Sequence, residues 1–514
     1  MKKLLTSATI SGMALILLLN SCKKGDDYPG NQGGYKNIIF YALAAGMKLD
    51  KYNSSRPNSI LNSATISGLQ AKETILAIDF RPATGQLYGL GSSSRLYVID
   101  PKTGIARMIG AGAFTTPLTG DIAAFDFNPT VDRIRVVTSS GQNLRLNPET
   151  SAVAFVDGTI NGQTSAVIVA AAYTNNSAGQ TTTTLYDIDK TTNSLYIQSP
   201  PNDGTLKLVG SLNLNVGEGG FDISPDNSAL GIFKVENQSN LIGVDLASGK
   251  AKVIAKYNSN LSYNGIAIAT NPVAYAVDET NNLIIFNPEG KSSNSYGSSY
   301  NNSIDTILKP ISGIAAGAKI VGIDFRPLNG QLYALGNNSV VYTLNTSSGA
   351  ASVAGTLTTT LAGTNFGFDF NPVVDRIRIV SSSGQNLRFN PNDGTQLVDL
   401  ALNPGMPVVS AVAYSNNFAG TTATMLFAID ATLDKLYVVN PPNDGTLVFQ
   451  GNLGINAEDN NGFDIGGTSN MGYALFKSGS DTKLYSINTT TGVANQKGSL
   501  KSSVINGFTL GLGF

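Results

Sequence analysis

Aspartate residues recur at one position of a repeated motif, and they are the residues of this chain best suited to chemistry. Each stands next to Phe at the end of an apolar run: Asp79, Asp126, Asp222, Asp324, Asp369 and Asp464. Clustered carboxylates could bind Ca²⁺, a hard cation that takes six to eight oxygen ligands, or act as the paired acids of a glycoside hydrolase. The alternative is structural, because aspartate at a turn commonly accepts backbone N–H groups. Repetition of the residue from motif to motif favours the structural interpretation.

Arginines form a second candidate ligand-binding set, close behind two of these aspartates. The members are Arg133, Arg135 and Arg145, then Arg376, Arg378 and Arg388. Only 13% of the residues are charged, so such a set needs an explanation. Guanidinium groups could clamp a carboxylate, a phosphate or an acidic sugar with paired hydrogen bonds. The alternative is an Arg–Asp network that ties strands together, with Asp126 and Asp132 as partners.

Composition excludes several classes of function. The chain has no His and no Trp, which rules out Ser-His-Asp and Cys-His catalysis and His-ligated metal. With 34 Lys and Arg against 35 Asp and Glu, nothing indicates nucleic-acid binding. A carboxylate-dependent glycosidase could use Glu218 with Asp79 and Asp126, although the absence of Trp weakens sugar stacking. We predict no catalytic residue and no cofactor, with Ca²⁺ as the one cation that the aspartates could hold.

The first 36 residues read as an address and a tether. Lys2 and Lys3 precede the apolar run 13–19, which is too short to span a bilayer. The next residues, through Ser21 and Cys22, resemble a bacterial lipobox, so we predict a lipoprotein signal peptide over 1–22 with lipidation of Cys22. An ordinary signal peptide cut near Ser21 is the alternative. Residues 23–36 are polar and Gly-rich, typical of a flexible tether. Its acidic pair at 26–27 resembles export signals, which favours an outer-membrane lipoprotein facing the cell surface over one facing the periplasm.

The rest of the chain is one module written twice. Of the 24 residues at 125–148, 20 are identical to those at 368–391, and the other motifs recur in the same order. Each copy divides into units of four short β-branched or aromatic runs bounded by Gly, Pro, Asn or Asp, as in residues 75–110. Four-stranded units of 35 to 50 residues are typical of β-propeller blades. The sequence therefore predicts an all-β protein.

The way the blades close is open to two interpretations. The first unit of each copy has only three strands, while the runs 263–269 and 505–512 have no unit of their own. If these runs complete the first unit of their own copies, the chain forms two tandem five-bladed β-propellers, over 37–270 and 271–514. If 263–269 stays with the strands that follow it, the ten units form a single ten-bladed ring. We favour the two propellers.

The motifs around Asp79 and Asp126, with Arg81-Pro82 after the first and Asn128-Pro129 after the second, resemble a bacterial family known as domain of unknown function 4394. The resemblance covers both copies. It implies a secreted, propeller-like domain of roughly 240 residues, and it brings no activity or catalytic residue that could be transferred.

Propellers carry many functions, so the fold licenses no activity. The sequence favours a non-enzymatic, lipid-anchored binding or scaffold protein of the cell envelope, with a protein or polysaccharide partner and no nucleic acid. The alternative is a carboxylate-dependent glycoside hydrolase or lyase, with a site at the mouth of a propeller channel. A purely structural role in the envelope is a third possibility.

Overall fold

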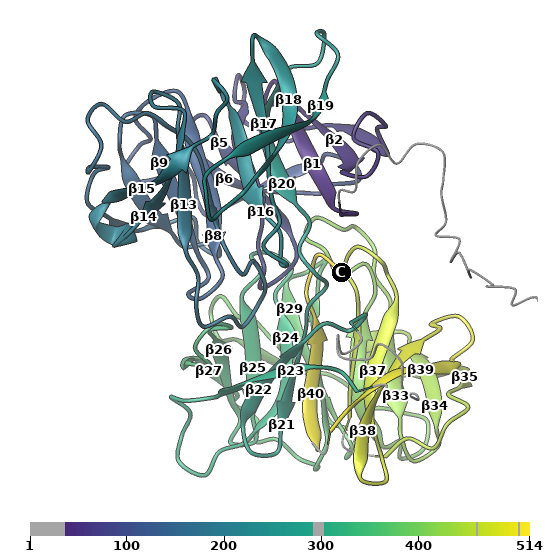
Figure 1. Cartoon of the computed structure of the whole chain (residues 1–514). Helices are drawn as coiled ribbons and strands as arrows, with labels where there is room; N and C mark the ends of the chain where they lie inside the picture. Colours follow the sequence, from purple (N-terminus) through teal and green to yellow (C-terminus); the bar gives the residue numbers. More distant parts are fainter. Residues whose placement is uncertain (1–35, 291–302, 459–460, 502–503) are drawn as a thin grey trace, which may run out of the picture.

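The computed structural model describes residues 36–290, 303–458, 461–501 and 504–514 (Figure 1). These residues form forty strands in ten four-stranded antiparallel sheets, and none of them lies in an α-helix. No helix in this part of the chain is long and apolar enough to cross a membrane. The predicted signal peptide, Cys22 and all of the tether except Lys36 lie outside the described residues.

Five sheets make up the first half of the chain, residues 36–270. Their strands, sheet by sheet, are β20 (Tyr263–Ile268), β1 (Ile39–Ala44), β2 (Lys48–Asn53) and β3 (Asn62–Thr65); β4 (Ile75–Phe80), β5 (Leu87–Gly91), β6 (Arg95–Ile99) and β7 (Ala106–Ile109); β8 (Ala123–Asn128), β9 (Arg133–Thr138), β10 (Asn143–Leu146) and β11 (Val153–Val156); β12 (Ile168–Tyr173), β13 (Leu185–Asp189), β14 (Ser194–Gln198) and β15 (Leu206–Ser211); β16 (Gly219–Ile223), β17 (Ala229–Val235), β18 (Gln238–Val244) and β19 (Ala251–Lys256). A short 3₁₀ turn, Pro201–Asp203, precedes β15.

The second half, residues 271–514, repeats this order. Its strands are β40 (Ile505–Leu510), β21 (Ala274–Asp278), β22 (Asn282–Phe286) and β23 (Thr306–Pro310); β24 (Ile320–Phe325), β25 (Leu332–Gly336), β26 (Val340–Leu344) and β27 (Ala351–Thr356); β28 (Phe366–Asn371), β29 (Arg376–Ser381), β30 (Asn386–Phe389) and β31 (Gln396–Val398); β32 (Val409–Tyr414), β33 (Leu426–Asp430), β34 (Lys435–Val439) and β35 (Leu447–Asn452); β36 (Asn461–Ile465), β37 (Gly472–Ser478), β38 (Asp481–Ile487) and β39 (Ala494–Leu500). The matching 3₁₀ turn is Pro442–Asp444.

The late strands pair as the closure interpretation predicted. β20 pairs antiparallel with β1, and β40 pairs antiparallel with β21. Within the first half, the leading strand of each sheet contacts the next, in the order β4, β8, β12, β16 and β20, and β20 contacts β4 again. Strands β24, β28, β32, β36 and β40 form the same circuit in the second half. We call these ten the inner strands. Because 263–268 joins β1, the interpretation that kept it with the strands after it is wrong.

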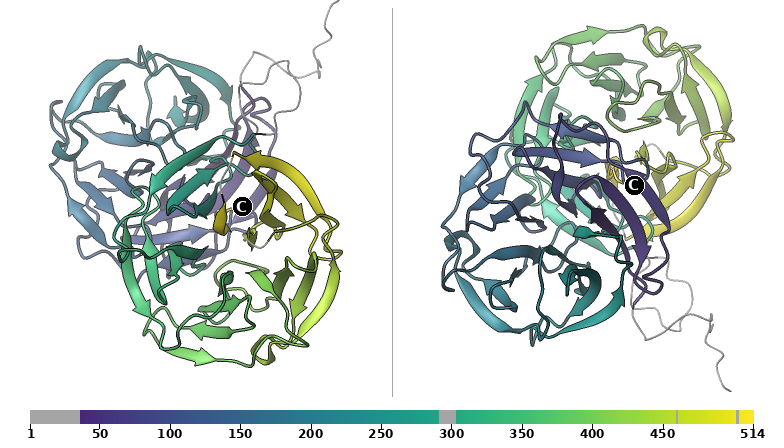
Figure 2. Two further views of the ribbon diagram at one scale, coloured as in Figure 1. Left: turned by 90° about the horizontal axis from the view of Figure 1, so that it is seen from below. Right: turned by 90° about the horizontal axis from the view of Figure 1, so that it is seen from above.

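The inner strands consist of small and apolar residues because they are buried on both faces. All six residues of β12, including three consecutive alanines, are buried. At Gly220 on β16, a Cβ atom would lie 2.7 Å from the backbone nitrogen of Ile266 on β20, and Gly462 on β36 meets Phe508 on β40 as closely. Larger side chains fill the space between sheets, as Tyr41, Ile78 and Tyr97 do between the first two. The inner strands are therefore held in fixed register around each circuit (Figure 2).

Candidate functional site

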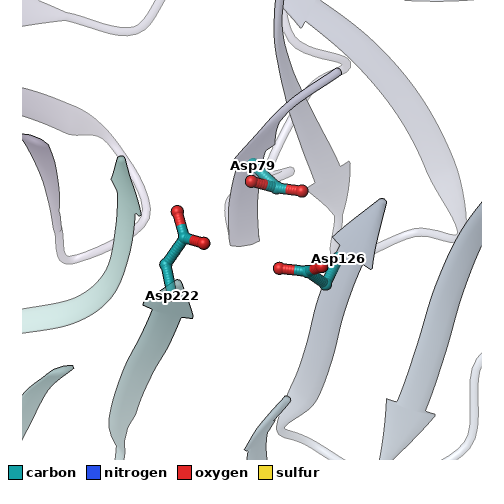
Figure 3. A group of neighbouring side chains, drawn as sticks. All are labelled: Asp79, Asp126 and Asp222. Atoms are coloured by element: carbon teal, nitrogen blue, oxygen red, sulfur yellow. The ribbon is translucent and has the colours of Figure 1, made fainter. Parts of the chain in front are cut away.

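Three of the predicted aspartates meet at the ends of inner strands in each half. Asp79 on β4, Asp126 on β8 and Asp222 on β16 are each 1% exposed, and each offers a carboxylate oxygen within 4.8 Å of the others. Figure 3 shows the three carboxyl groups pointing toward one another across the centre of the circuit. Asp324, Asp369 and Asp464 form the matching group in the second half. We call these groups the first and second triads.

Backbone N–H groups occupy most of the triad oxygens. In the first triad, Asp79 accepts from its own neighbour Phe80 at 2.7 Å and from Phe127 on β8 at 2.8 Å. Asp126 accepts from Tyr173 on β12 at 3.0 Å, and Asp222 accepts from Ile268 on β20 at 2.5 Å. Each carboxylate thus ties its own inner strand to the next one in the circuit. The second triad repeats these bonds.

The two remaining inner strands of each half have no aspartate at this position. Strands β12 and β20 carry Ala172 and Ala267, while the second half has Ala413 on β32 and Thr509 on β40. The Thr509 hydroxyl lies 2.9 Å from both Asp324 and Asp464. A hydroxyl has one hydrogen to donate, so the second of these contacts is a hydrogen bond only when that carboxyl is protonated.

Burial and mutual repulsion make it costly to ionise the whole triad. Burial raises the pKa of Asp222, and of its counterpart Asp464, to about 7. Burial and the neighbouring carboxylates raise the pKa of Asp79 and Asp126 well above the ordinary value. Like charges this close in a low-dielectric interior disfavour the ionised form. At neutral pH the triad therefore has to be neutralised in part, by bound protons or by a cation.

The triad supplies only part of what a cation would need. Five of its six carboxylate oxygens already accept a backbone N–H: both of Asp79, both of Asp222 and one of Asp126. Each oxygen keeps a second lone pair, so one Ca²⁺ could take three ligands here and would need at least three more from water or backbone carbonyls. The arrangement fits a strand clamp directly and a cation site only with those additional ligands.

The predicted hydrolase set is not brought together. Glu218 precedes β16, whereas Asp222 lies four residues further along, which separates them by roughly 13 Å along the strand. Glu218 is partly exposed and lies 3.5 Å from Lys234. The cavity among the inner strands, lined by Ile78, Phe125 and their neighbours, has a volume of about 20 Å³, which is room for water and not for a sugar.

The arginine network differs from the predicted one in its partners. Arg135 is 2% exposed and donates to Asp157 at 2.6 Å and to Asn202 of the next sheet at 2.8 Å. Arg145 also pairs with Asp157, while Arg133 is half-exposed and donates to the Asp132 carbonyl. The expected partners Asp126 and Asp132 are wrong for Arg135, because Asp126 turns to the centre of the circuit. In the second half, Arg376, Arg378 and Arg388 take the same places.

Asp132 instead belongs to a buried group between the two halves. It forms an ion pair with Arg81, which is 0% exposed and also contacts Glu149 at 2.5 Å. The Arg81 guanidinium reaches further, donating to the Gly330 carbonyl of the second half at 3.1 Å. The Arg81-Pro82 motif therefore places a charge where the halves meet.

Asp187 on β13 is a buried titratable residue that sequence reasoning missed. It is 0% exposed, neither carboxylate oxygen has a hydrogen-bond partner among the described residues, and burial raises its pKa to about 8. The strand register aligns it with Ala428 of the second half. That exchange of Ala for Asp between otherwise similar strands is the signal that could have identified it.

Asp187→Ala is expected to raise the melting temperature at pH 9 and to leave it nearly unchanged at pH 5. The folded carboxyl holds its proton to higher pH than the unfolded one, so the wild type loses stability as the pH rises from about 4 to 8. Calorimetry at the two pH values checks this. Asp189→Ala is the control, because Asp189 accepts from Val167 and Thr191 and its loss should destabilise at both. Equal shifts of the Asp187 variant at pH 5 and pH 9 would contradict the prediction.

Comparison with protein families settles the relationship suggested by the motifs. Residues 48–267 and 298–509 both match the model of a single family, described as a domain of unknown function (DUF4394). The chain belongs to this family. It carries two copies of DUF4394 in tandem, as the sequence predicted, and the two triads and two arginine networks fall one to each copy.

No curated protein matches the chain. Among solved structures, the extracellular domain of the hybrid two component system BT4673 from B. thetaiotaomicron is similar, at 10% identity and a TM-score of 0.26. That match covers 90% of this chain and 77% of the other. A likeness of this degree carries no argument about the function of DUF4394.

Proposed function

We propose that the chain is a lipid-anchored protein of the cell envelope, built from two five-bladed β-propellers that act as a binding module or scaffold. The observation that carries the proposal is the internal use of every strong candidate for chemistry. The aspartates of both triads clamp inner strands, and the arginines that are fully buried pair with Asp157 and Asp399. What remains free is the outer surface.

Strand pairing and inner-strand contacts support the propeller assignment. Each half has five sheets whose inner strands follow one another in a circuit, and each half draws its closing strand from its own end. Closure of this kind leaves no inner edge unpaired, which protects the sheets from pairing with other chains. Rigid rings of this type present turns at their two ends, which suits recognition of a protein or a polysaccharide.

The cell-envelope location rests on the N-terminal sequence. Lys36, the first described residue, forms an ion pair with Asp226 at 2.8 Å, so the predicted tether would leave the first half beside the turn after β16. We propose an outer-membrane lipoprotein anchored through Cys22 and facing the cell surface. Labelling of intact cells with a protease would test the orientation, since a periplasmic protein would be protected.

Binding by the soluble form, beginning at Lys36, tests the function. Its melting temperature would be followed with Ca²⁺, EDTA, acidic sugars and neutral polysaccharides, because a ligand of the folded state raises that temperature by mass action. Saturable binding of a polysaccharide or an envelope protein without turnover would support a binding module. Hydrolysis of a polysaccharide that is lost in Asp126→Asn with the fold intact would overturn it in favour of the glycoside hydrolase. Inertness toward every ligand and partner would leave a purely structural scaffold.

A further inference from the structure

The two halves pack through turns that follow the inner strands of the first half. Pro82 and Ala83 follow β4, Pro129 and Asp132 follow β8, and Ala178 and Gly179 follow β12; together they line one small cavity with Tyr275, Thr346 and Ser347 of the second half. Tyr275 donates its hydroxyl hydrogen to the Ala83 carbonyl at 2.9 Å. We call residues 81–86, 128–132 and 174–180 the first turn face. It is a surface that demonstrably packs on another repeat of this chain.

The second half has the same face, and it is exposed. By strand register its turns are 326–331, 371–375 and 415–421, which we call the second turn face. Figure 2 shows, in the view from above, that the sheets of β28–β35 extend beyond the first half, so this part of the face is uncovered. Asp375, the counterpart of the buried Asp132, is correspondingly more exposed, at 25% of its side chain against 5%.

Exposure and side-chain type run opposite to expectation between the two faces. Leu328, Val373 and Phe418 of the second turn face are 43%, 42% and 47% exposed. Their counterparts on the covered first turn face are Ala83, Thr130 and Ser177, which are smaller or polar. Because the first-half counterparts share a cavity wall, the second-half residues also lie on one surface. A contiguous group of exposed apolar residues marks an interaction site.

We propose that the second turn face binds the same face of a second copy of this chain, forming a two-fold symmetric dimer. A contact of this kind places Leu328, Val373 and Phe418 of one copy against the same residues of the other, and an apolar patch is complementary to itself. Both copies then bury the residues that the isolated chain leaves exposed. The half-exposed pair of Arg326 and Asp375 lies beside the patch and would form part of its polar rim.

A head-to-tail contact between copies is disfavoured by the surface it would need. Within the chain, Gly179 of the first turn face lies against Ile285 and Ile307 of the second half: a Cβ atom built on it would be 3.1 Å from each Cδ1. The first-half counterparts of these isoleucines are Lys51 and Asn62. Phe418 of another copy would have to desolvate Lys51, which lies over the Tyr41 ring. Replacing two isoleucines by polar residues thus blocks an open chain of copies and leaves the two-fold contact.

Sedimentation equilibrium of the soluble form beginning at Lys36 tests the dimer. The wild type should have twice the mass of the chain at micromolar concentration. The triple variant Leu328→Ala, Val373→Thr, Phe418→Ser installs the residues that the first half carries, and it should raise the dissociation constant at least about 100-fold, since it removes three central apolar side chains from each side. The matched control, Phe155→Ser, Val156→Thr, Leu208→Ala, removes equally exposed apolar residues from β11 and β15 and should leave the dimer intact. A monomeric wild type, or a dimer that the triple variant leaves unchanged, would overturn the proposal.

A single cysteine distinguishes the two-fold contact from any other arrangement. The chain has one Cys, at position 22, so the soluble form has none. Phe418→Cys should give a covalent dimer with a short thiol crosslinker, because a two-fold contact places the same residue of both copies close together. The control Phe155→Cys should remain uncrosslinked at the same concentration. A dimeric Phe418→Cys protein that does not crosslink would exclude the symmetric arrangement.

Discussion

Replacing Arg135 with methionine is expected to lower the melting temperature of the first half by on the order of 10 °C. Breaking a buried, hydrogen-bonded ion pair by removing one partner costs about 3–5 kcal/mol. In a domain of this size each kcal/mol corresponds to roughly 2–4 °C. The fall should be seen as an early transition in calorimetry, with the second half melting close to its usual temperature.

The size of the effect follows from what the guanidinium holds. Arg135 donates to Asn143 at 2.7 Å, to Asp157 at 2.6 Å and to Asn202 at 2.8 Å, and its Nε lies 3.3 Å from the Tyr173 hydroxyl. Asn202 belongs to the next sheet, so the network joins two sheets as well as two strands. Methionine is similar in length and donates nothing, which leaves these acceptors buried without a partner.

Two variants serve as controls. Arg133→Met removes a half-exposed arginine that donates only to a backbone carbonyl, and it should change the melting temperature by less than about 2 °C. Arg378→Met should repeat the Arg135 effect in the second half, because its contacts are the same. An Arg135 variant that melts like the wild type but no longer binds an acidic ligand would instead show that the arginines form a clamp for that ligand.

The fold was predictable because alternation and turn residues repeat with little interruption. The runs expected within 75–110 became β4, β5, β6 and β7, with boundaries that moved by no more than a residue or so. Closure was predictable for a different reason: duplication left one strand at the end of each copy without a sheet, and only the first, three-stranded unit could take it.

The partners of the site residues were not predictable, because they depend on how sheets pack. Register places Arg135 directly opposite Asp126 on β8, which made that pair look natural. Instead the Asp126 carboxylate accepts the Tyr173 N–H, and Arg135 reaches Asp157 and Asn202, which follow β11 and β14. No periodicity in the sequence indicates which loop of the next sheet comes within reach. The same holds for Arg81, whose carbonyl acceptor lies 249 residues away at Gly330.

The stability of the protein is also expected to fall as the pH rises from about 4 to 7. Asp222 titrates near its ordinary value in the unfolded chain and at about 7 in the folded one, so the folded state binds more protons across this range. Stability decreases with pH wherever the folded state holds the extra proton. Three pKa units correspond to about 4 kcal/mol as an order of magnitude, and Asp464 adds a similar effect in the second half.

The substitution Asp126→Asn isolates the contribution of the first triad. Only one oxygen of Asp126 accepts a backbone N–H, from Tyr173, and the asparagine carbonyl can keep that bond. The amide nitrogen then replaces the remaining oxygen and offers hydrogens to the neighbouring carboxylates. We expect a variant at least as stable as the wild type at pH 8, with a shallower pH dependence. Asp222→Asn is the contrasting variant: both Asp222 oxygens accept N–H groups, so its amide nitrogen would face a donor and lower the stability at every pH.

The same pair of proteins separates protons from a cation as the neutralising agent of the triad. If protons neutralise it, EDTA leaves the melting temperature at pH 8 unchanged, and the wild type becomes more stable on acidification while Asp126→Asn changes less. If Ca²⁺ neutralises it, EDTA lowers the melting temperature of the wild type at pH 8, added Ca²⁺ restores it by mass action, and Asp126→Asn loses that response because one of three carboxylate ligands is gone. A wild type whose melting temperature is flat from pH 4 to 8 in EDTA would contradict the raised pKa values on which both alternatives rest. The acid-stabilised outcome would identify the triads as proton-sharing clamps that hold the inner strands together.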